Sequence, residues 1–476
     1  MRKTLVLILC LAGTLAAQQA PDFSQFIKVN AAVVALTHVR VIDGTGAAAR
    51  DDQTLVISGG KIQSIGPASA AVPAGAKTLD LAGYSVMPGM VGMHEHLFYP
   101  AGGPPPLFSE MGFSFPRMYL AGGVTTARTG GSIEPYTDLA IKRNIDTGQM
   151  IGPKLRITGP YLEGAGSFTP DLYELKDADD ARRTVAYWSQ EGATSFKAYM
   201  NITRAELGAA IDEAHKHGFK LTGHLCSVTF SEAADLGIDN LEHGITEDTE
   251  FVAGKKPDEC PSGRKALQAL LKLDIQSAPV QAMVRKLVEK KVAVTSTLAV
   301  LEAFVPNSAS EPARRKSLLQ KRVLDAMSAD ARARYLQSRA NIGPESPWAT
   351  GMKKEMEFER SFVAAGGLLM MGVDPTGNGG ALPGYGDQRQ LELLVEAGFT
   401  PLEAIRIATL NAAQFLGEAE HIGSLAPGKQ ADVLVIKGDP SRDIGDIEKL
   451  EIVFKDGVGW DSAALFDSVR GLVGIR

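Results

Sequence analysis

The chain has 476 residues, of which 45% are hydrophobic and 22% are charged, and these proportions are ordinary for a globular protein. Its formal net charge is -6, from 49 basic and 55 acidic residues that are spread along the sequence. This balance gives no electrostatic signature of nucleic-acid binding. We therefore expect a small-molecule or dipeptide substrate and no nucleic-acid partner.

The first 17 residues have the pattern of a signal peptide. Arg2 and Lys3 supply positive charge, residues 5–15 are apolar, and residues 16–17 are alanines of the kind that a signal peptidase accepts. The apolar stretch is shorter than the roughly 20 residues that a membrane-spanning helix needs. We expect a mature chain that begins near Gln18, is periplasmic or secreted and has no membrane contact after cleavage. A retained membrane anchor is the alternative.

Three cysteines are present. Cys10 lies in the predicted leader, and a lipid anchor there is disfavoured because bulky Leu9 precedes it. Only Cys226 and Cys260 remain in the mature chain, too few for a disulfide scaffold and without the paired spacing of a structural zinc site. The sequence leaves open whether these two are bridged or free.

Short β-rich runs separated by turn residues occupy both ends of the mature chain. The N-terminal end includes ALTHVRVID and DQTLVISGGKIQSIG, and the C-terminal end repeats this texture in ADVLVIKGDP and LEIVFKDG. Alternating apolar residues bounded by glycine, aspartate and asparagine predict small antiparallel strands. We predict one composite β-sandwich domain formed by both termini, from residues 18–88 and 422–476.

The middle of the chain, residues 89–421, alternates short apolar runs with helical patterns, which is typical of βαβ units and a parallel sheet. The candidate strands are VGMHEHLF, GVTTART, KLRITGP, ATSFKAY, FKLTGH, NLEHG, VAVTSTLAV and LLMMGVD. Eight such strands favour a closed (β/α)8 TIM barrel over an open doubly wound sheet. The predicted fold class is therefore α/β, a TIM barrel with a small β-sandwich domain.

The stretch from about 303 to 360 is long for a single strand-to-strand connection. Its charged segments, among them RRKSLLQKRVLDAM and MKKEMEFERSF, have helical composition and predict a helical insertion. Helices over the barrel mouth and helices on the barrel exterior are both compatible with it.

Polar residues end several of the predicted barrel strands, where the active groups of this fold sit. They are His94 and His96 on the first strand, Lys197 on the fourth, His224 on the fifth, His243 on the sixth and Asp374 on the eighth. Residues two apart on a strand share a face, so both histidines of the first strand point into the barrel while Glu95 points outward. Four of the chain's eight histidines at strand ends predict a metal site.

Lys197 is the unusual member of this set, because an ammonium group repels a cation. A desolvated lysine can react with carbon dioxide and become an anionic carbamate whose two oxygens bridge two divalent ions. The alternative is a buried or salt-bridged lysine. Asp374 can bind one metal, accept a proton from the attacking water and pass it to the leaving group. Its alternative role is to cap the following turn or helix.

Together these residues resemble the amidohydrolase superfamily, and the resemblance covers nearly the whole mature chain. MPGMVGMHEHLF is similar to the family's entry into the first strand and FKAY to its carboxylated-lysine strand, while GH, EHG and GVD fit the later ligands in order. SLAPGKQADVLVI resembles the return to the β domain. The resemblance implies two divalent ions, usually zinc. The implied ligands are His94, His96 and Asp374 for one ion, His224 and His243 for the other, and carboxylated Lys197 between them.

Within the superfamily the chain is most similar to prolidase-like and imidazolonepropionase-like hydrolases. The cues are GVTTART followed by GPKLRITGP, and Tyr199 two residues after the lysine, although Cys226 stands where some relatives have a second histidine. This branch implies cleavage of Xaa-Pro or Xaa-hydrophobic dipeptides, or of N-acyl amino acids. Tyr199 becomes a candidate for oxyanion stabilisation and substrate contact. Arg128 and Arg389 become candidates for binding a substrate carboxylate, with surface positions as their alternative.

We therefore expect an exported binuclear metal-dependent amidohydrolase in which a water activated by the metals attacks an amide carbonyl. Hydrolysis of cyclic amides, lactones or phosphoesters on the same site is an alternative, and a mononuclear deaminase without a bridging lysine is another. A non-catalytic scaffold would normally have lost ligands. The sequence leaves the oligomeric state open, a homo-oligomer included.

Overall fold

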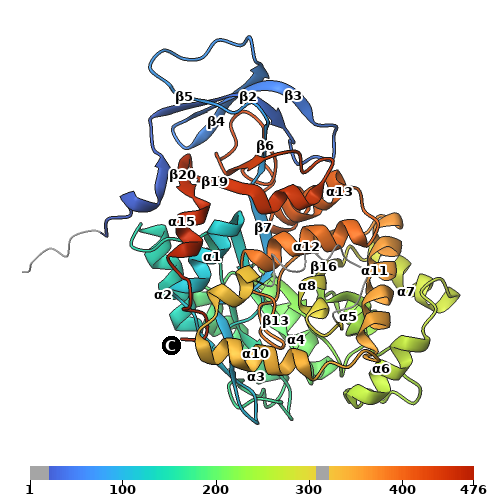
Figure 1. Ribbon diagram of the computed structural model, residues 1–476. Coiled ribbons are helices and arrows are strands. Elements are labelled where there is room, and N and C mark those ends of the chain that lie inside the picture. The colour runs from blue at the N-terminus through green and yellow to red at the C-terminus, as the bar shows by residue number, and fades with distance from the viewer. Residues whose placement is uncertain (1–20, 307–320, 476) are drawn as a thin grey trace, which may run out of the picture.

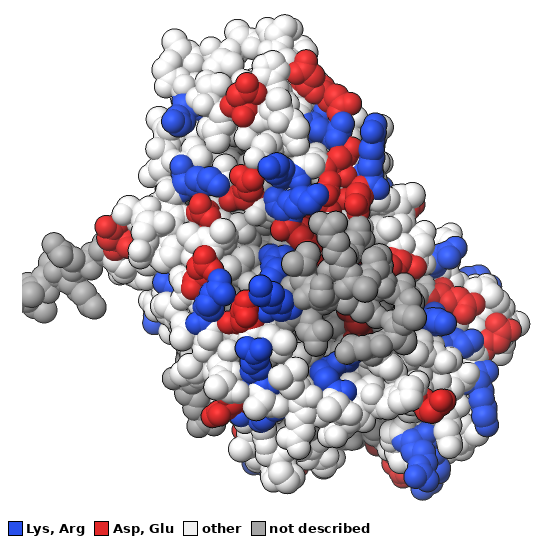
Figure 2. Space-filling view, viewed as in Figure 1, with Lys and Arg blue, Asp and Glu red and all other residues white. Residues whose placement is uncertain are grey.

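The computed structural model describes residues 21–306 and 321–475. The predicted signal peptide and its cleavage site lie outside these residues. Within the described ranges, no helix is both long and apolar enough to cross a membrane. A sheet made from both ends of the chain lies at the top of Figure 1, above a barrel of strands that helices surround. On the face shown in Figure 2, acidic and basic side chains of the described residues are interspersed.

The two ends of the chain form one nine-stranded sheet. Its members are β1 (Ile27–Val29), β2 (Val33–Val41), β3 (Arg50–Ser58), β4 (Lys61–Pro67), β5 (Lys77–Asp80), β6 (Tyr84–Pro88), β18 (Val433–Lys437), β19 (Leu450–Lys455) and β20 (Val458–Asp461). The strand order is β1-β20-β19-β18-β6-β2-β3-β4, with β5 beside β2. The β18–β6 pair joins the C-terminal strands to the N-terminal ones, as the composite domain requires.

Strands β6, β18 and β19 are buried on both faces. Alternate residues of these strands face the core of the β domain: Val86, Val433, Val435, Ile452 and Phe454. The residues between them along the same strands belong to the larger core that is shared with the barrel: Met87, Leu434, Ile436 and Val453. Successive side chains of a strand point to opposite sides, so one continuous apolar run serves both cores. This two-sided burial attaches the β domain to the barrel.

The barrel contains all eight runs that the sequence predicts. Its strands are β7 (Met90–Glu95), β10 (Val124–Thr129), β11 (Lys154–Arg156) with β12 (Thr158–Leu162), β13 (Ser195–Ala198), β14 (Lys220–Gly223), β15 (Asn240–Glu242), β16 (Ala293–Ser296) and β17 (Leu369–Met371). The third run is interrupted at Ile157, so β11 pairs with β10 and β12 pairs with β13. The backbone N–H of Asp374 donates to the carbonyl of His94 at 2.9 Å, which joins the last strand to the first. The predicted fold class is confirmed.

Helices follow the strands and cover the outside of the barrel (Figure 1). They include α1 (Ser114–Gly122), α2 (Pro135–Asp146), α3 (Ala178–Glu191), α4 (Arg204–Lys216), α5 (Phe230–Leu236), α6 (Gly263–Lys272), α7 (Ala278–Glu289), α12 (Tyr385–Glu396), α13 (Pro401–Arg406), α14 (Ala412–Leu416) and α15 (Ser462–Asp467). Capping boxes begin α4, α5 and α13, where Thr203, Thr229 and Thr400 pair with a glutamate three residues later. Each box satisfies two of the free N–H groups at its helix start.

The described part of the predicted insertion reaches both the barrel mouth and the barrel exterior. It contributes α10 (Ala329–Ala340) and α11 (Trp348–Ala364), and α8 (Leu298–Glu302) precedes it. Phe304 and Trp348 line the central cavity. Further along α11, Phe358 and Phe362 are fully buried in the main core. Residues 307–320 of the predicted insertion lie outside the described residues.

Candidate metal centre

His94 lies near the C-terminal end of β7 and is fully buried. Its Nδ1 is 2.9 Å from Oε2 of Glu242, so this nitrogen carries the proton and Nε2 keeps the lone pair that can bind a metal ion. Burial, with a contribution from Lys197, lowers the pKa of His94 to about 4. The neutral imidazole is the form that binds a metal ion.

Glu242 is held in turn by Arg128, whose Nη2 lies 2.9 Å from Oε1. Burial by itself would raise the pKa of Glu242, but Arg128 and His94 keep it well below its usual range. Arg128 also donates to the carbonyl of Met93 and to the hydroxyl of Thr222, and it does not line the cavity. The structure therefore corrects the expectation that Arg128 binds a substrate carboxylate. Its guanidinium is fully used in hydrogen bonds and an ion pair inside the barrel.

Asp374 follows β17 at the centre of the site. One carboxylate oxygen, Oδ1, is 3.4 Å from Nε2 of His96, and the other is 3.9 Å from Nε2 of His243. Burial would raise the pKa of Asp374, but the three neighbouring histidines, His94 among them, hold it well below its usual range. The hydroxyl of Thr376 donates to Oδ1 at 2.7 Å. Asp374 is therefore an ionised carboxylate within reach of three imidazoles.

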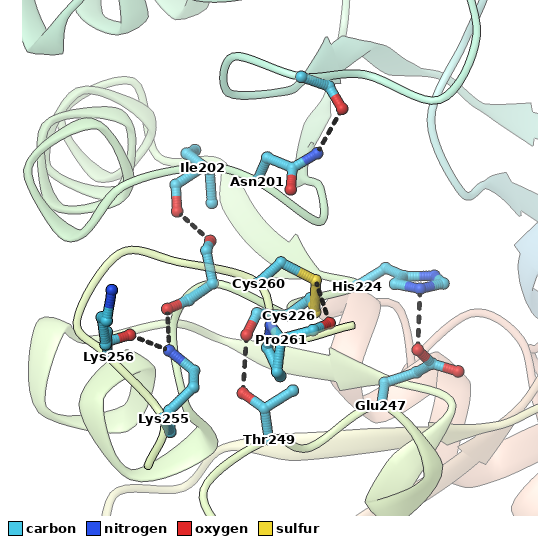
Figure 3. Close-up of a disulfide and its surroundings, with 12 residues drawn as sticks. Asn201, Ile202, His224, Cys226, Glu247, Thr249, Lys255, Lys256, Cys260 and Pro261 are labelled. Atoms are coloured by element: carbon cyan, nitrogen blue, oxygen red, sulfur yellow. Dashed lines mark hydrogen bonds and ion pairs between the residues drawn. A yellow bond between two sulfur atoms is a disulfide. The ribbon is translucent and has the colours of Figure 1, made fainter. Parts of the chain in front are cut away.

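His243 and His224 follow β15 and β14. The Nδ1 of His243 is 2.6 Å from the hydroxyl of Thr297, while its buried Nε2 has no hydrogen-bond partner among the described residues. The ring centroids of the two histidines lie 4.5 Å apart. His224 faces Glu247, whose Oε2 is 3.1 Å from Nε2, as Figure 3 shows. Two imidazoles therefore converge from neighbouring strands.

Lys197 completes the predicted set from β13. Its Nζ lies 2.9 Å from Nε2 of His94 and is enclosed by the rings of Tyr161 and Tyr199. Burial lowers the pKa of Lys197 to about 8. The lowered pKa increases the fraction of neutral amine near neutral pH, and the neutral amine is the form that reacts with carbon dioxide.

The donor atoms fit a divalent metal ion. One nitrogen each of His94 and His243 and one oxygen of Asp374 lie within 4.8 Å of one another. A buried nitrogen without a partner, such as Nε2 of His243, is costly unless a ligand occupies the position in front of it. Imidazole and carboxylate donors of this kind suit zinc. His96, His224 and Lys197 border the three-residue cluster, as the contacts above show.

A cavity of about 350 Å³ opens onto these residues. All six predicted ligands line it, and so does Tyr199. The rest of the wall is mainly aromatic and aliphatic, and it includes Phe98, Phe108, Tyr161, Phe168, Leu172, Val300, Leu301, Phe304 and Trp348. Such a wall with a few converging polar groups is typical of a small-molecule site.

The structure also corrects the expectation for Arg389. This residue lies on α12 and is only 5% exposed. Its guanidinium pairs with Glu302, Glu392 and Glu396 at 2.6 to 2.8 Å, and it is not among the cavity-lining residues. Three carboxylates neutralise the charge of Arg389. Although this residue follows the eighth strand in the sequence, it does not lie in the site.

Three neighbours of the candidate ligands are not indicated by the sequence motifs. Glu242 and Thr297 hold the imidazoles of His94 and His243, and Glu247 adds a carboxylate to the cavity wall. Glu242 stands beside a ligand in the EHG motif, and Thr297 directly follows β16. Glu242 could have been found from its place next to a candidate ligand, and Thr297 from its place at the end of a barrel strand.

A comparison with models of protein families shows to which family the chain belongs. Residues 85–459 match the model of the amidohydrolase family. The chain belongs to the amidohydrolase family. The family name indicates hydrolysis, and the cluster of His94, His243 and Asp374 could hold a metal ion.

Individual relatives match over short segments. An imidazolonepropionase of Deinococcus deserti is 38% identical over 86 residues, which cover 18% of this chain and 21% of that protein. An adenine deaminase of Moorella thermoacetica is 42% identical over 43 residues, or 9% of this chain and 7% of the relative. The matches thus span about a fifth or less of these relatives' own length. A solved prolidase in complex with N-methylphosphonate-L-proline is similar in fold, with a TM-score of 0.66, 19% identity, and coverage of 90% of this chain and 99% of that one.

Proposed function

We propose that the chain is a binuclear amidohydrolase that cleaves an amide bond beside a hydrophobic group, in Xaa-Pro or Xaa-hydrophobic dipeptides or in N-acyl amino acids. One observation carries this proposal: six potential ligands from five barrel strands open onto one largely aromatic cavity. The fold likeness to a prolidase holding a proline analogue supports the substrate class. The sequence match to an imidazolonepropionase favours a cyclic amide as the second candidate.

The proposed cofactor is a pair of divalent ions, with zinc as the first candidate. The residues that would hold them are His94, His96 and Asp374 for one ion and His224 and His243 for the other, with carboxylated Lys197 between them. When bound, such ions lower the pKa of a water molecule and polarise a carbonyl group.

Asp374 is the proposed proton carrier. Its neighbouring histidines keep it ionised, so it can accept a proton when water attacks the amide carbon. Thr376 donates to Oδ1, which leaves Oδ2 as the oxygen on which a proton can be held. Returning that proton to the departing nitrogen completes the cleavage and releases an amine.

Tyr199 is the proposed donor to the oxyanion. Its ring lies 4.8 Å from the rings of Tyr161 and His224, at the edge of the ligand set. Burial raises the pKa of Tyr199 well above its usual value, so the phenol keeps its proton. A preorganised donor of this kind stabilises negative charge that develops on the carbonyl oxygen. The aromatic wall would bind the hydrophobic side chain and exclude bulk water.

We also propose that the enzyme is exported to the periplasm or beyond the cell. The leader pattern of residues 1–17 supports this location. A disulfide between Cys226 and Cys260 supports it independently, because disulfides persist in oxidising compartments. The pairing of these cysteines is the answer to the question that the sequence left open. A homo-oligomeric state stays a prediction.

The test combines metal analysis with a substrate panel. The purified mature protein, supplied with zinc, should contain two metal ions per chain and hydrolyse members of a dipeptide and N-acyl amino acid library. Chelation should abolish the activity and zinc should restore it. Hydrolysis of a lactone or ester with no cleavage of any amide would contradict the proposal. One metal per chain together with ammonia release from a purine, unaffected by Lys197→Ala, would indicate a deaminase.

A further inference from the structure

The charges around the cavity are unevenly distributed. Among its described lining residues, Lys197 is the only lysine or arginine, and it belongs to the ligand set. The two arginines that the sequence offered for a substrate carboxylate are paired with glutamates elsewhere. The wall contains two carboxylates, Asp374 and Glu247. Apart from the metal ions that the ligand set would hold, the wall therefore offers a charged substrate group a carboxylate and no free lysine or arginine among the described lining residues.

Glu247 is the carboxylate that the catalytic proposal does not use. It directly follows the short helix η2 (Gly244–Thr246), and its side chain is 24% exposed. Within the described part of the chain its carboxylate contacts His224, and no lysine or arginine pairs with it. The compact donor cluster of His94, His243 and Asp374 does not include it. Glu247 thus presents a negative charge beside the ligand set.

The segment that carries Glu247 is tied to the fifth-strand loop. The hydroxyl of Thr249 donates to the carbonyl of Cys226 at 2.7 Å, and Cys226 is bridged to Cys260. The ammonium group of Lys255 donates to the carbonyl of Ser227 at 2.6 Å. Figure 3 shows these contacts on one side and the facing pair of His224 and Glu247 on the other. The segment that follows Glu247 is therefore held against the fifth-strand loop.

We propose that Glu247 binds the ammonium group of the substrate, so that the enzyme recognises a dipeptide by its free amino end. This inference rests on the proposed amide hydrolysis. In an α-amino acyl group, one carbon separates the ammonium nitrogen from the scissile carbonyl carbon. The group that binds this ammonium must therefore lie beside the ligand set. Glu247 does so, with Oε2 at 3.1 Å from Nε2 of His224.

The physical basis is charge pairing in a largely apolar cavity. Hydrogen bonds between charged groups are about twice as strong as neutral ones. The ring of Tyr199, 4.8 Å from that of His224 and 6.1 Å from that of Phe168, adds an aromatic face near the same place, which favours a cation. Both substrate classes bring a carboxylate that no arginine of the described lining residues pairs with, but an N-acyl amino acid lacks the ammonium and gains nothing from Glu247. Free dipeptides are therefore the preferred class.

The experiment compares three forms of the best dipeptide in the panel: the free dipeptide, its C-terminal amide and its N-acetyl derivative. We expect similar kcat/KM for the first two and a value roughly 10- to 100-fold lower for the N-acetyl form, the size of a lost hydrogen bond to a charged group. Glu247→Gln should remove most of this discrimination, chiefly by raising KM for the two substrates with a free amine. Glu259→Gln, an exposed glutamate of the same loop region, is the matched control.

Two further readouts make the result decisive. The metal content of Glu247→Gln should equal that of the wild type, and its thermal unfolding should be unchanged. Loss of metal, or an equal loss of kcat/KM on all three substrates, would overturn the inference and make Glu247 a ligand or a catalytic group. If none of the three is cleaved, the proposed function fails, and calorimetry still tests the anchor. L-leucinamide should then bind the wild type at least about tenfold more tightly than Glu247→Gln, while N-acetyl-L-leucinamide should not distinguish them.

Discussion

The side-chain nitrogen of Lys197 lies 2.9 Å from Nε2 of His94, and both groups are closed off from solvent. An ammonium group at this distance would compete with any metal ion for the free nitrogen of the imidazole. Carboxylation would replace that positive charge with an anion. The contact therefore makes the chemical state of Lys197 the central question of the site.

Lys197→Ala should lower kcat/KM on the order of 10³-fold, comparable to the loss of a well-placed catalytic group. Metal content should fall from two ions per chain toward one, because the bridging anion is lost. Elemental analysis checks the metal, and ¹³C-bicarbonate labelling with NMR should show a carbamate signal in the wild type alone. Lys216→Ala, an exposed lysine on α4, is the control. Undiminished activity and metal content in Lys197→Ala would contradict carboxylation.

Glu242→Leu should reduce both stability and metal affinity. It leaves the buried Arg128 without its ionic partner, which costs about 3–5 kcal/mol. It also removes the acceptor for Nδ1 of His94, and loss of such a partner lowers metal affinity about 10- to 100-fold. Urea unfolding and competition with a zinc chelator measure the two effects.

The double variant Arg128→Met with Glu242→Leu separates those effects. It should recover much of the lost free energy of unfolding, because no unpaired charge is left in the barrel. It should not recover the metal affinity, because the acceptor for His94 is still missing. Recovery of both quantities would show that Glu242 acts on the metal site only through overall stability.

The barrel strands and the residues that line its mouth could be predicted because local pattern determines both. Apolar runs at regular spacing identify the strands, and the end of a run identifies the side chain that faces the mouth. His94 and Asp374 lie at such ends and are brought together by the closure of the barrel. No long-range contact had to be known in advance.

The depth of a side chain inside the barrel could not be predicted. Arg128 and Thr129 both lie at the end of β10, and only the packing shows that the arginine reaches across to Glu242. The position of the Arg389 guanidinium similarly depends on carboxylates of α8 and α12, which belong to none of the motifs. The pairing of Cys226 with Cys260 also required the structure, since it depends on a loop that returns to the fifth strand.

Removal of the disulfide should destabilise the chain and the site together. Cys226 and Cys260 are 34 positions apart, and closing a loop of that size stabilises a folded chain by about 4 kcal/mol on an entropic estimate. Cys260→Ser should lower the free energy of unfolding by a comparable amount and loosen the segment that carries Glu247. Thermal and urea unfolding measure the first effect.

The reductant TCEP provides the internal control for this variant. It should reproduce the loss in the wild type and have no further effect on Cys260→Ser. Hydrogen exchange should rise in the segment around Thr249, whose side chain contacts the carbonyl of Cys226. If the reduced wild type unfolded at the same urea concentration as the oxidised protein, the stabilising role of the bridge would be excluded.

Two buried glutamates on α11 should make the chain less stable as pH rises. Burial raises the pKa of Glu359 to about 8, and burial together with Glu359 raises that of Glu355 well above its usual value of 4.5. Between about pH 4.5 and 8 the folded chain therefore keeps protons that the unfolded chain has released. The free energy of unfolding should fall across this window, by at most about 1.4 kcal/mol per pH unit for each group.

Glu359→Gln tests this directly because the amide cannot ionise. Below about pH 4.5 the carboxyl group is protonated in both states, so the variant and the wild type should respond to pH alike. As pH rises toward 8 the variant should gain stability relative to the wild type, since only the wild type must bury an acid against its tendency to ionise. Urea unfolding from pH 5 to 8 measures the difference, and Glu357→Gln on the same helix is the partly exposed control. A constant difference over this range would mean that Glu359 is already ionised in the folded chain, and its burial would then require a cation beside it.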